Sequence, residues 1–257
     1  MPYLHQIGRP NPFAKATHRF ERKMIETNLG TYWDLRDIMT ALPHLKFKDG
    51  YTLDAYYAGD MDNANMKLYA YRMDSMDVYD PGSPGVHRNP KDRFSGLFSK
   101  EKAPEPIPFR DGQVVTGTIS YAASDTVPSI ENYLDIDFTP QAIWEALLLI
   151  EEADNYLLHC WHGGYANGRL IVDRLSLIQS CHGHLSNKEY EPVLLGNRLT
   201  PGVCMQSDDE ALIHYCRWGD WSGLNYITIK AIRNGRTLSF ERMDTECLIE
   251  YDCGIRF

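Results

Sequence analysis

The stretch ALIHYCRWGDWSGLNYITIKAIRNGRTLSF, residues 211–240, decides the fold class of this chain. Asn-Gly at 234–235 stands between two apolar runs, and this dipeptide is the strongest short-range signal for a tight β-hairpin. We therefore expect antiparallel strands at 224–232 and 237–243, and residues 211–218 have the composition of a further strand.

The same hairpin signal occurs once more upstream. Asn-Gly at 167–168 lies between LLHCWHGGY and RLIV, which predicts a second hairpin with strands at 156–162 and 169–179. Apolar residues alternate with acidic ones over 246–253 and predict another half-buried strand. The C-terminal part is therefore expected to form a mostly antiparallel, hairpin-rich sheet.

One helix is clearly indicated beside this sheet. Thr139-Pro140 supplies an N-cap followed by proline at the first helical position, so we expect a helix over 140–153. An apolar stripe recurs along it at helical spacing, formed by Ile143, Leu147 and Ile150. Its acidic residues are expected on the opposite side, namely Glu145, Glu151 and Glu152. The helix should pack on the sheet through the apolar stripe.

The N-terminal segment has helical character and contains one hairpin. Residues 13–28 are charged and periodic, and a second helix is expected between a cap at Thr31 and Pro43. Tyrosine-rich strands should follow at 51–59 and 66–73. The predicted fold class is α+β: a helical N-terminal segment, the helix near 140–153, and the antiparallel sheet.

A proline-rich stretch separates two halves of the chain. Residues 81–112 hold six of the fourteen prolines, which lack a backbone donor and interrupt regular structure. The sequence therefore predicts a linker or long loop at 81–112. It divides an N-terminal helical and hairpin lobe, 1–80, from an antiparallel sheet domain with one main helix, 113–257.

Composition limits the classes of partner. The formal net charge is −9, which disfavours nucleic acid and membrane surfaces and favours a cationic partner. The first twenty residues hold no apolar segment typical of a secretory signal, so we expect a cytoplasmic protein. Six cysteines without a CxxC pair are then expected to be reduced thiols.

Two mirrored triplets are candidate metal ligands. Cys160 and His162 are two residues apart, as are His214 and Cys216, so each pair shares one face of its strand. Two neighbouring antiparallel strands could bring all four together, and zinc binds such a set tetrahedrally. Alternatively, the cysteines are small buried apolar residues, and this is the interpretation we favour.

Candidate catalytic residues are few. Asp135 and Asp137 share a face of a short strand that leads into the 140–153 helix, and paired carboxylates suit a divalent metal and phosphoryl chemistry. His182 stands in a Cys-His-Gly-His run with acid–base capacity. The simpler interpretation places these groups in solvent, on an edge strand and a polar turn.

Aromatic residues are abundant, with sixteen tyrosines and five tryptophans. Tyrosine and tryptophan are favoured interface anchors, and the candidate binding residues are Trp33, Tyr56, Tyr57, Trp218 and Trp221. The phosphate-cradling GxGxxG and GxxxxGK patterns and the GxSxG elbow do not occur.

The sequence thus favours a non-catalytic, immunity- or adaptor-like binding protein without a cofactor, which recognises a protein partner through an aromatic, acidic surface. The alternative is a metal-dependent hydrolase or phosphoryl-handling enzyme that uses zinc or another divalent metal. Whether the chain is an enzyme, and its oligomeric state, stay open at this level.

Overall fold

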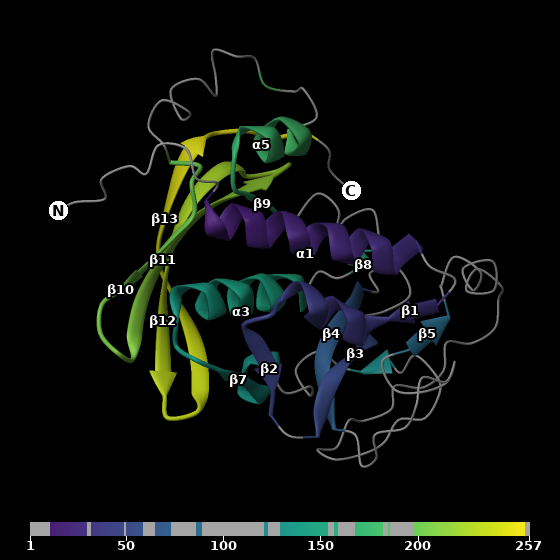
Figure 1. Ribbon diagram of the computed structural model, residues 1–257. Coiled ribbons are helices and arrows are strands. Elements are labelled where there is room, and N and C mark those ends of the chain that lie inside the picture. Colours follow the sequence, from purple (N-terminus) through teal and green to yellow (C-terminus); the bar gives the residue numbers. More distant parts are fainter. Residues whose placement is uncertain are drawn as a thin grey trace.

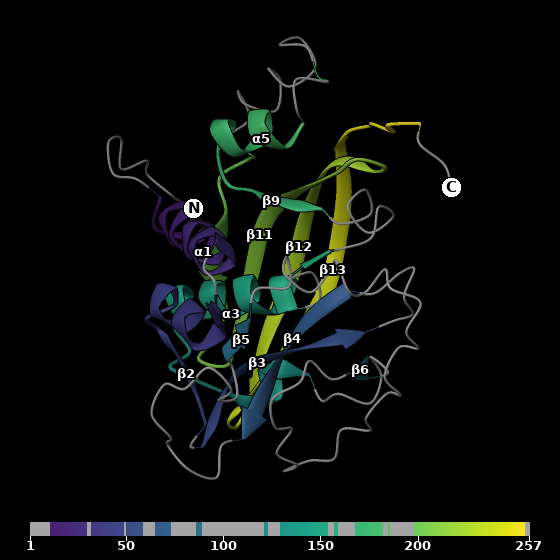
Figure 2. The same cartoon turned by 90° about the vertical axis from the view of Figure 1, so that its right-hand side faces the viewer.

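The computed structural model describes residues 11–29, 32–48, 50–58, 65–72, 86–88, 121–122, 129–153, 157–158, 168–181, 185 and 198–254. Helices and a five-stranded antiparallel sheet form an α+β fold, as the sequence predicts (Figure 1). The long helices α1 (Pro12–Leu29) and α3 (Pro140–Ala153) contact each other and lie against one face of this sheet (Figures 1 and 2).

The five-stranded sheet lies in the C-terminal part of the chain. Its main order is β10 (Gly202–Met205), β11 (Glu210–Gly219), β12 (Gly223–Asn234) and β13 (Thr237–Ile249). The short strand β9 (Arg169–Ile171) pairs with the far end of β11, opposite Cys216 to Trp218. All these pairings are antiparallel.

The predicted hairpin at Asn234-Gly235 is confirmed. Asn234 pairs with Thr237, so Gly235 and Arg236 form the two-residue loop. Gly235 has a φ of 65°, a left-handed conformation that glycine adopts without strain. The second strand is longer than expected and continues to Ile249.

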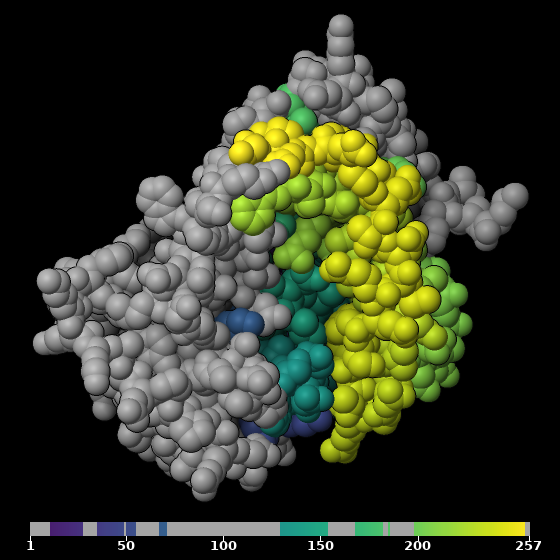
Figure 3. Space-filling view, turned by 180° about the vertical axis from the view of Figure 1, so that it is seen from behind, coloured from purple at the N-terminus to yellow at the C-terminus, as the bar shows by residue number. Residues whose placement is uncertain are grey.

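The long strand β13 is an edge of this sheet. Its residues 241–247 are all exposed, and β13 forms a continuous surface strip when the molecule is viewed from behind (Figure 3). The pairing with β12 shifts register twice, between Thr228 and Ile229 and between Leu224 and Asn225. Such irregularities, together with the charged residues along 241–246, discourage pairing with another strand.

Both long helices begin at caps that the sequence supplies. The Asn11 side chain accepts from the backbone N–H groups of Phe13 (2.8 Å) and Ala14 (3.1 Å). At α3, the Thr139 hydroxyl accepts from the Ala142 N–H at 3.3 Å. The bounds of α3 are those expected, whereas the second predicted helix is the 3₁₀ helix η1 (Leu35–Ala41), which follows strand β1 (Tyr32–Asp34).

The remaining strands form three small sheets. Strands β3 (Tyr51–Ala58) and β4 (Asn65–Arg72) make the expected hairpin, flanked by β6 (Tyr121–Ala122) and β8 (Leu157–Leu158). The 3₁₀ helix η3 (Ile130–Tyr133) leads into β7 (Leu134–Ile136), which pairs with β2 (Leu45–Phe47). Strand β1 pairs with β5 (Val86–Arg88), the one described part of the proline-rich stretch.

The second predicted hairpin, 156–162 with 169–179, is wrong. Strand β8 pairs with β4, whereas β9 pairs with β11, so the two segments belong to different sheets. After β9 the chain forms helix α5 (Arg174–Ser180) rather than a continuing strand. The reason is local, because Asp173 accepts from the Ser176 N–H and the Ser176 hydroxyl accepts from the Asp173 N–H, a reciprocal capping box.

The main hydrophobic core lies between the helices and the sheet. It joins Phe20 of α1 and Trp144 of α3 to Tyr215 of β11, all of them buried. The indole of Trp144 donates to the Phe13 carbonyl at 3.1 Å, so its polar atom is satisfied. Because this cluster takes residues from both ends of the sequence, α1 is part of the same core as the C-terminal sheet.

The expected outward position of Glu145 on α3 is wrong. Its side chain is 1% exposed and accepts from Arg19 Nη2 at 2.7 Å and from the His44 backbone N–H at 2.8 Å. A buried carboxylate persists only when charged and hydrogen-bonding partners offset its desolvation. Glu145 therefore joins α1, α3 and the segment after η1.

No helix within the described ranges combines the length and apolar character needed to cross a membrane.

Candidate functional site

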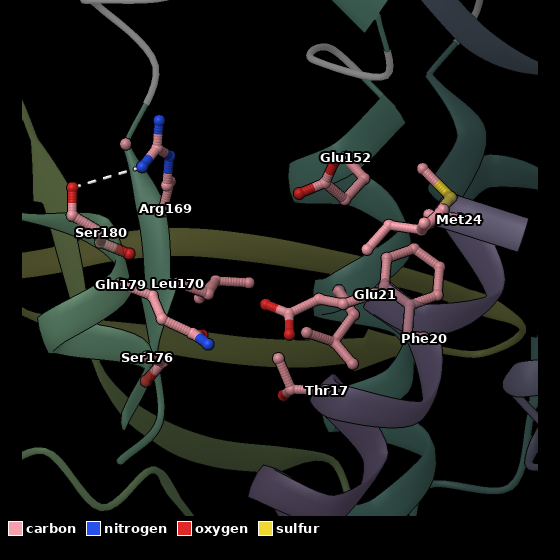
Figure 4. Close-up of a pocket in the computed structure, with 13 residues that line it drawn as sticks. Thr17, Phe20, Glu21, Met24, Glu152, Arg169, Leu170, Ser176, Gln179 and Ser180 are labelled. Atoms are coloured by element: carbon pink, nitrogen blue, oxygen red, sulfur yellow. Dashed lines mark hydrogen bonds between the residues drawn. The ribbon is translucent and has the colours of Figure 1, made fainter. Parts of the chain in front are cut away.

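A pocket of about 480 Å³ lies between α1, α3, β9 and α5 (Figure 4). One wall comes from the two long helices and the other from β9 and α5. The helical wall consists of Thr17, Phe20, Glu21, Met24, Ile25, Leu148 and Glu152. The opposite wall consists of Gly168, Arg169, Leu170, Ser176, Gln179 and Ser180.

Glu152 is the carboxylate with the most perturbed environment. It stands in the last turn of α3, and desolvation raises its pKa to about 7, with Glu21 and Glu151 adding to the shift against the opposing charge of Arg217. Among the described residues Glu152 makes no hydrogen bond or ion pair. A desolvated carboxylate without a bonded partner takes up a proton more readily than a solvated one. A cation placed beside it would stabilise its ionised form.

The cation whose charge acts on Glu152, Arg217, is already bonded to another carboxylate. Arg217 Nη1 lies 2.5 Å from Glu151 Oε2, and the Tyr215 hydroxyl donates to the other oxygen of Glu151 at 2.8 Å. Glu151 is thus matched by two donors of β11. Glu152, one residue further along α3, receives only the longer-range field of Arg217.

Glu21 and His18 connect the pocket to the start of α5. His18 Nδ1 lies 3.3 Å from Glu21 Oε2, and His18 Nε2 lies 2.7 Å from Asp173 Oδ2. A neutral imidazole carries one N–H, so it can donate to only one of two ionised carboxylates. Donation to both requires the imidazolium form of His18.

The pKa shifts of His18, Glu21 and Asp173 agree with these contacts of the His18 ring. Desolvation lowers the pKa of His18, but the hydrogen bond and the charge of Asp173 outweigh it, and the pKa is raised. Burial raises the pKa of Glu21, and His18 opposes this shift. Desolvation acts to raise the pKa of Asp173, but the Ser176 and His18 hydrogen bonds lower it below its usual range.

The far wall of the pocket is held in place at both ends of α5. The capping box anchors its start, and Arg169 Nη1 donates to the Ser180 carbonyl at its end, at 3.2 Å. Leu177 of α5 is buried in a second hydrophobic cluster with Ile171 and Trp218. The wall is therefore largely formed before any ligand arrives.

The candidate catalytic residues lie elsewhere. Asp135 is exposed and paired across the ladder with Lys46 in the two-stranded β2–β7 sheet, and Asp137 is exposed after it. Neither lines the pocket. His182 lies outside the described residues.

Of the four proposed metal ligands, the structure describes two, His214 and Cys216. His214 Nδ1 contacts the Thr228 hydroxyl at 3.2 Å, and its ring stacks on Tyr226. Cys216 is buried, its thiol contacts the Arg198 carbonyl at 3.3 Å, and burial raises its pKa to about 12. Cys160 and His162 lie outside the described residues, so the complete set stays a prediction. Within the described ranges no three His, Cys, Asp or Glu side chains form a metal-binding group.

One of the five proposed aromatic anchors is wrongly placed on the surface. Trp218 is 1% exposed, because the even-numbered side chains at this end of β11 face the second hydrophobic cluster. Its indole donates to Asp220 at 2.9 Å and its ring packs on Tyr251. Trp221 is half-buried. The side chains of Trp33, Tyr56 and Tyr57 are outside the described set.

The local sequence pattern does not mark the pocket residues as a site. Glu21 and Glu152 resemble ordinary solvated charges on amphipathic helices. Asp173-x-x-Ser176 is the one available signal, since an Asp and a Ser three residues apart can form a capping box and so predict α5. The pocket itself depends on how α1 and α5 meet, which no local pattern encodes.

Comparisons with family models, with curated proteins and with solved structures give no match to this chain. The geometry and chemistry of the described residues therefore carry the functional conclusion.

Proposed function

We propose that this chain is a non-catalytic binding protein that recognises a protein partner through the surface around the pocket. The observation that carries the proposal is that large apolar side chains are exposed on both of the helices that flank the pocket, α1 and α5. We call Ile25 of α1 with Leu175 and Ile178 of α5 the α1/α5 face.

The exposure of these side chains is unusual for large apolar residues. Ile25 is 60% exposed, Leu175 58% and Ile178 38%. They are three of the four large apolar side chains that are exposed in the described part of the chain. Leu175 and Ile178 are three residues apart on α5 and are therefore neighbours on its surface, and Ile25 stands on the helix across the pocket. Exposed apolar residues that adjoin one another beside polar ones are typical of a protein–protein contact.

The surroundings of the α1/α5 face suit a basic partner. Glu21 and Glu152 line the pocket beside it against one cation, Arg169, and the whole chain carries a net charge of −9. Such a field attracts a basic surface and accelerates its encounter. The capped α5 also presents Leu175 and Ile178 from a held helix, which reduces the ordering that binding requires.

A photo-crosslinking residue at position 175 tests this proposal in cells that produce the protein. We expect it to capture one protein, and the same residue at exposed Met243 on β13 not to capture that protein. The double variant Leu175→Ser/Ile178→Ser should abolish the complex when it is measured by size-exclusion chromatography. Capture from position 243 alone, or an intact complex in the double variant, would contradict the proposal.

The hydrolase alternative receives no support from Asp135 and Asp137. Both are exposed beside a small two-stranded sheet, without a third metal-ligating group among the described residues. We therefore propose the binding function alone.

A further inference from the structure

We infer that the pocket between α1, α3, β9 and α5 is a binding site for one cationic side chain, a lysine ammonium or an arginine guanidinium, inserted by the partner. The identity of the donor as a protein rests on the proposed function. The site itself rests on the charge, shape and bonding of the pocket.

The charge of the site comes from the helical wall. Figure 4 shows the Glu21 and Glu152 side chains extending from this wall toward the open middle of the pocket. Glu152 has no hydrogen-bonding or ionic partner among the described residues. An inserted cation would supply one, in a partly desolvated place where ion pairing is stronger than at the surface.

The other carboxylates nearby are already bonded, and the lining holds one cation. Glu151 is bonded to Arg217, and Asp173 to His18. Arg169 stands on the opposite wall and donates to the Ser180 carbonyl (Figure 4). With both glutamates ionised, the lining therefore carries two negative charges, Glu21 and Glu152, against the one positive charge of Arg169.

The shape of the pocket suits a long side chain with a charged end. Phe20, Met24, Leu148 and Leu170 provide apolar surface in the same pocket lining as the carboxylates. Lysine and arginine lay their methylene stems on such surface and keep the charged group at a polar site. A volume of about 480 Å³ is in the range of small-ligand sites and accommodates such a side chain.

Cation uptake should be coupled to proton release. The groups that act on Glu152 are Glu21 from α1, Glu151 from α3 and Arg217 from β11. An added cation stabilises the ionised carboxylate, so binding should strengthen as the pH rises through about 7. At Glu21 the incoming cation also competes with the His18 imidazolium.

Four small probes test the site without knowledge of the partner. Nα-acetyl-lysine amide and Nα-acetyl-arginine amide carry the two cationic side chains, and Nα-acetyl-norleucine amide and Nα-acetyl-citrulline amide are their neutral analogues. Titrated into the full chain by NMR at about pH 8, at least one cationic probe should bind about tenfold or more tightly than its neutral analogue. The better of the two shows which cation the pocket prefers.

Variants of two acidic residues localise the binding. Glu152→Gln should weaken the cationic probe by about tenfold, whereas the matched change Glu26→Gln, at an exposed position of α1 outside the pocket lining, should leave it unchanged. Equal binding of neutral and cationic probes, equal effects of the two variants, or no probe binding would overturn the inference. These results would leave the α1/α5 face intact as a contact surface, because crosslinking at position 175 tests that face separately.

Discussion

Glu145 and Glu152 stand seven residues apart on α3, about two helical turns, so both project toward α1. Glu145 is buried, bonded to Arg19 and to the His44 backbone. Glu152 lines a pocket, and no described residue bonds to it. The same residue type on one helix face is thus a structural element at one position and an available ligand group at the other. The two glutamates differ in their partners, because Arg19 is bonded to Glu145 and no described cation is bonded to Glu152.

The largest expected effect comes from removing the matched carboxylate. Glu145→Ala should lower the free energy of unfolding by roughly 2–4 kcal/mol, because Arg19 and the His44 N–H lose their acceptor inside the structure. Urea unfolding followed by circular dichroism measures it. A loss below about 0.5 kcal/mol would show that the two glutamates do not differ as described.

The unmatched carboxylate should behave in the opposite way. The pKa of Glu152 is raised from 4.5 to about 7 in the folded chain, so its contribution favours folding below pH 4.5 and is lost as the pH rises through 7. Glu152→Gln should therefore stabilise the protein by roughly 1–2 kcal/mol at about pH 8 and have little effect at about pH 5. Melting at the two pH values checks this, and a destabilised variant at pH 8 would contradict it.

The stability of helix α5, on the far wall of the pocket, should depend on its N-terminal cap. Asp173→Ala removes the acceptor of the Ser176 N–H at the start of α5 and should lower the free energy of unfolding by about 1 kcal/mol. Asp173→Asn is the matched control, since asparagine caps equally well but cannot pair with a charged His18. Hydrogen exchange of the α5 amides should rise in the alanine variant and stay near the parent value in the asparagine variant.

The smallest effect concerns His18. Its folded-state pKa is raised above 6.5, so its stabilisation is present below that value and is lost as the pH rises through the folded-state pKa. His18→Gln should lower the free energy of unfolding by roughly 0.5 kcal/mol at about pH 5.5, a small value because the side chains involved are partly exposed. The loss should vanish near pH 8.5, and NMR titration of the His18 ring in the parent and in Glu21→Gln should show a lower pKa in the variant.

Local signals predicted several elements of the fold correctly. Thr139-Pro140 and the apolar stripe define α3, and Asn234-Gly235 defines the β12–β13 hairpin. These signals succeed because a cap or a tight turn is made by residues adjacent in sequence. The Asn-Gly at 167–168 failed as a hairpin signal because β8 and β9 each pair with a more distant strand.

The sequence by itself determined that this chain is an acidic α+β protein with a C-terminal antiparallel sheet, since composition and short-range pattern suffice for that. Only the tertiary structure decided that Trp218 is buried, that Glu145 meets Arg19, and that Glu152 is left without such a partner in a pocket facing α5. Each of these depends on contacts between segments far apart in the chain, such as α1 with α3 or β9 with β11. A single side chain carries the same propensities in either setting, so its role follows from the neighbours that folding brings to it.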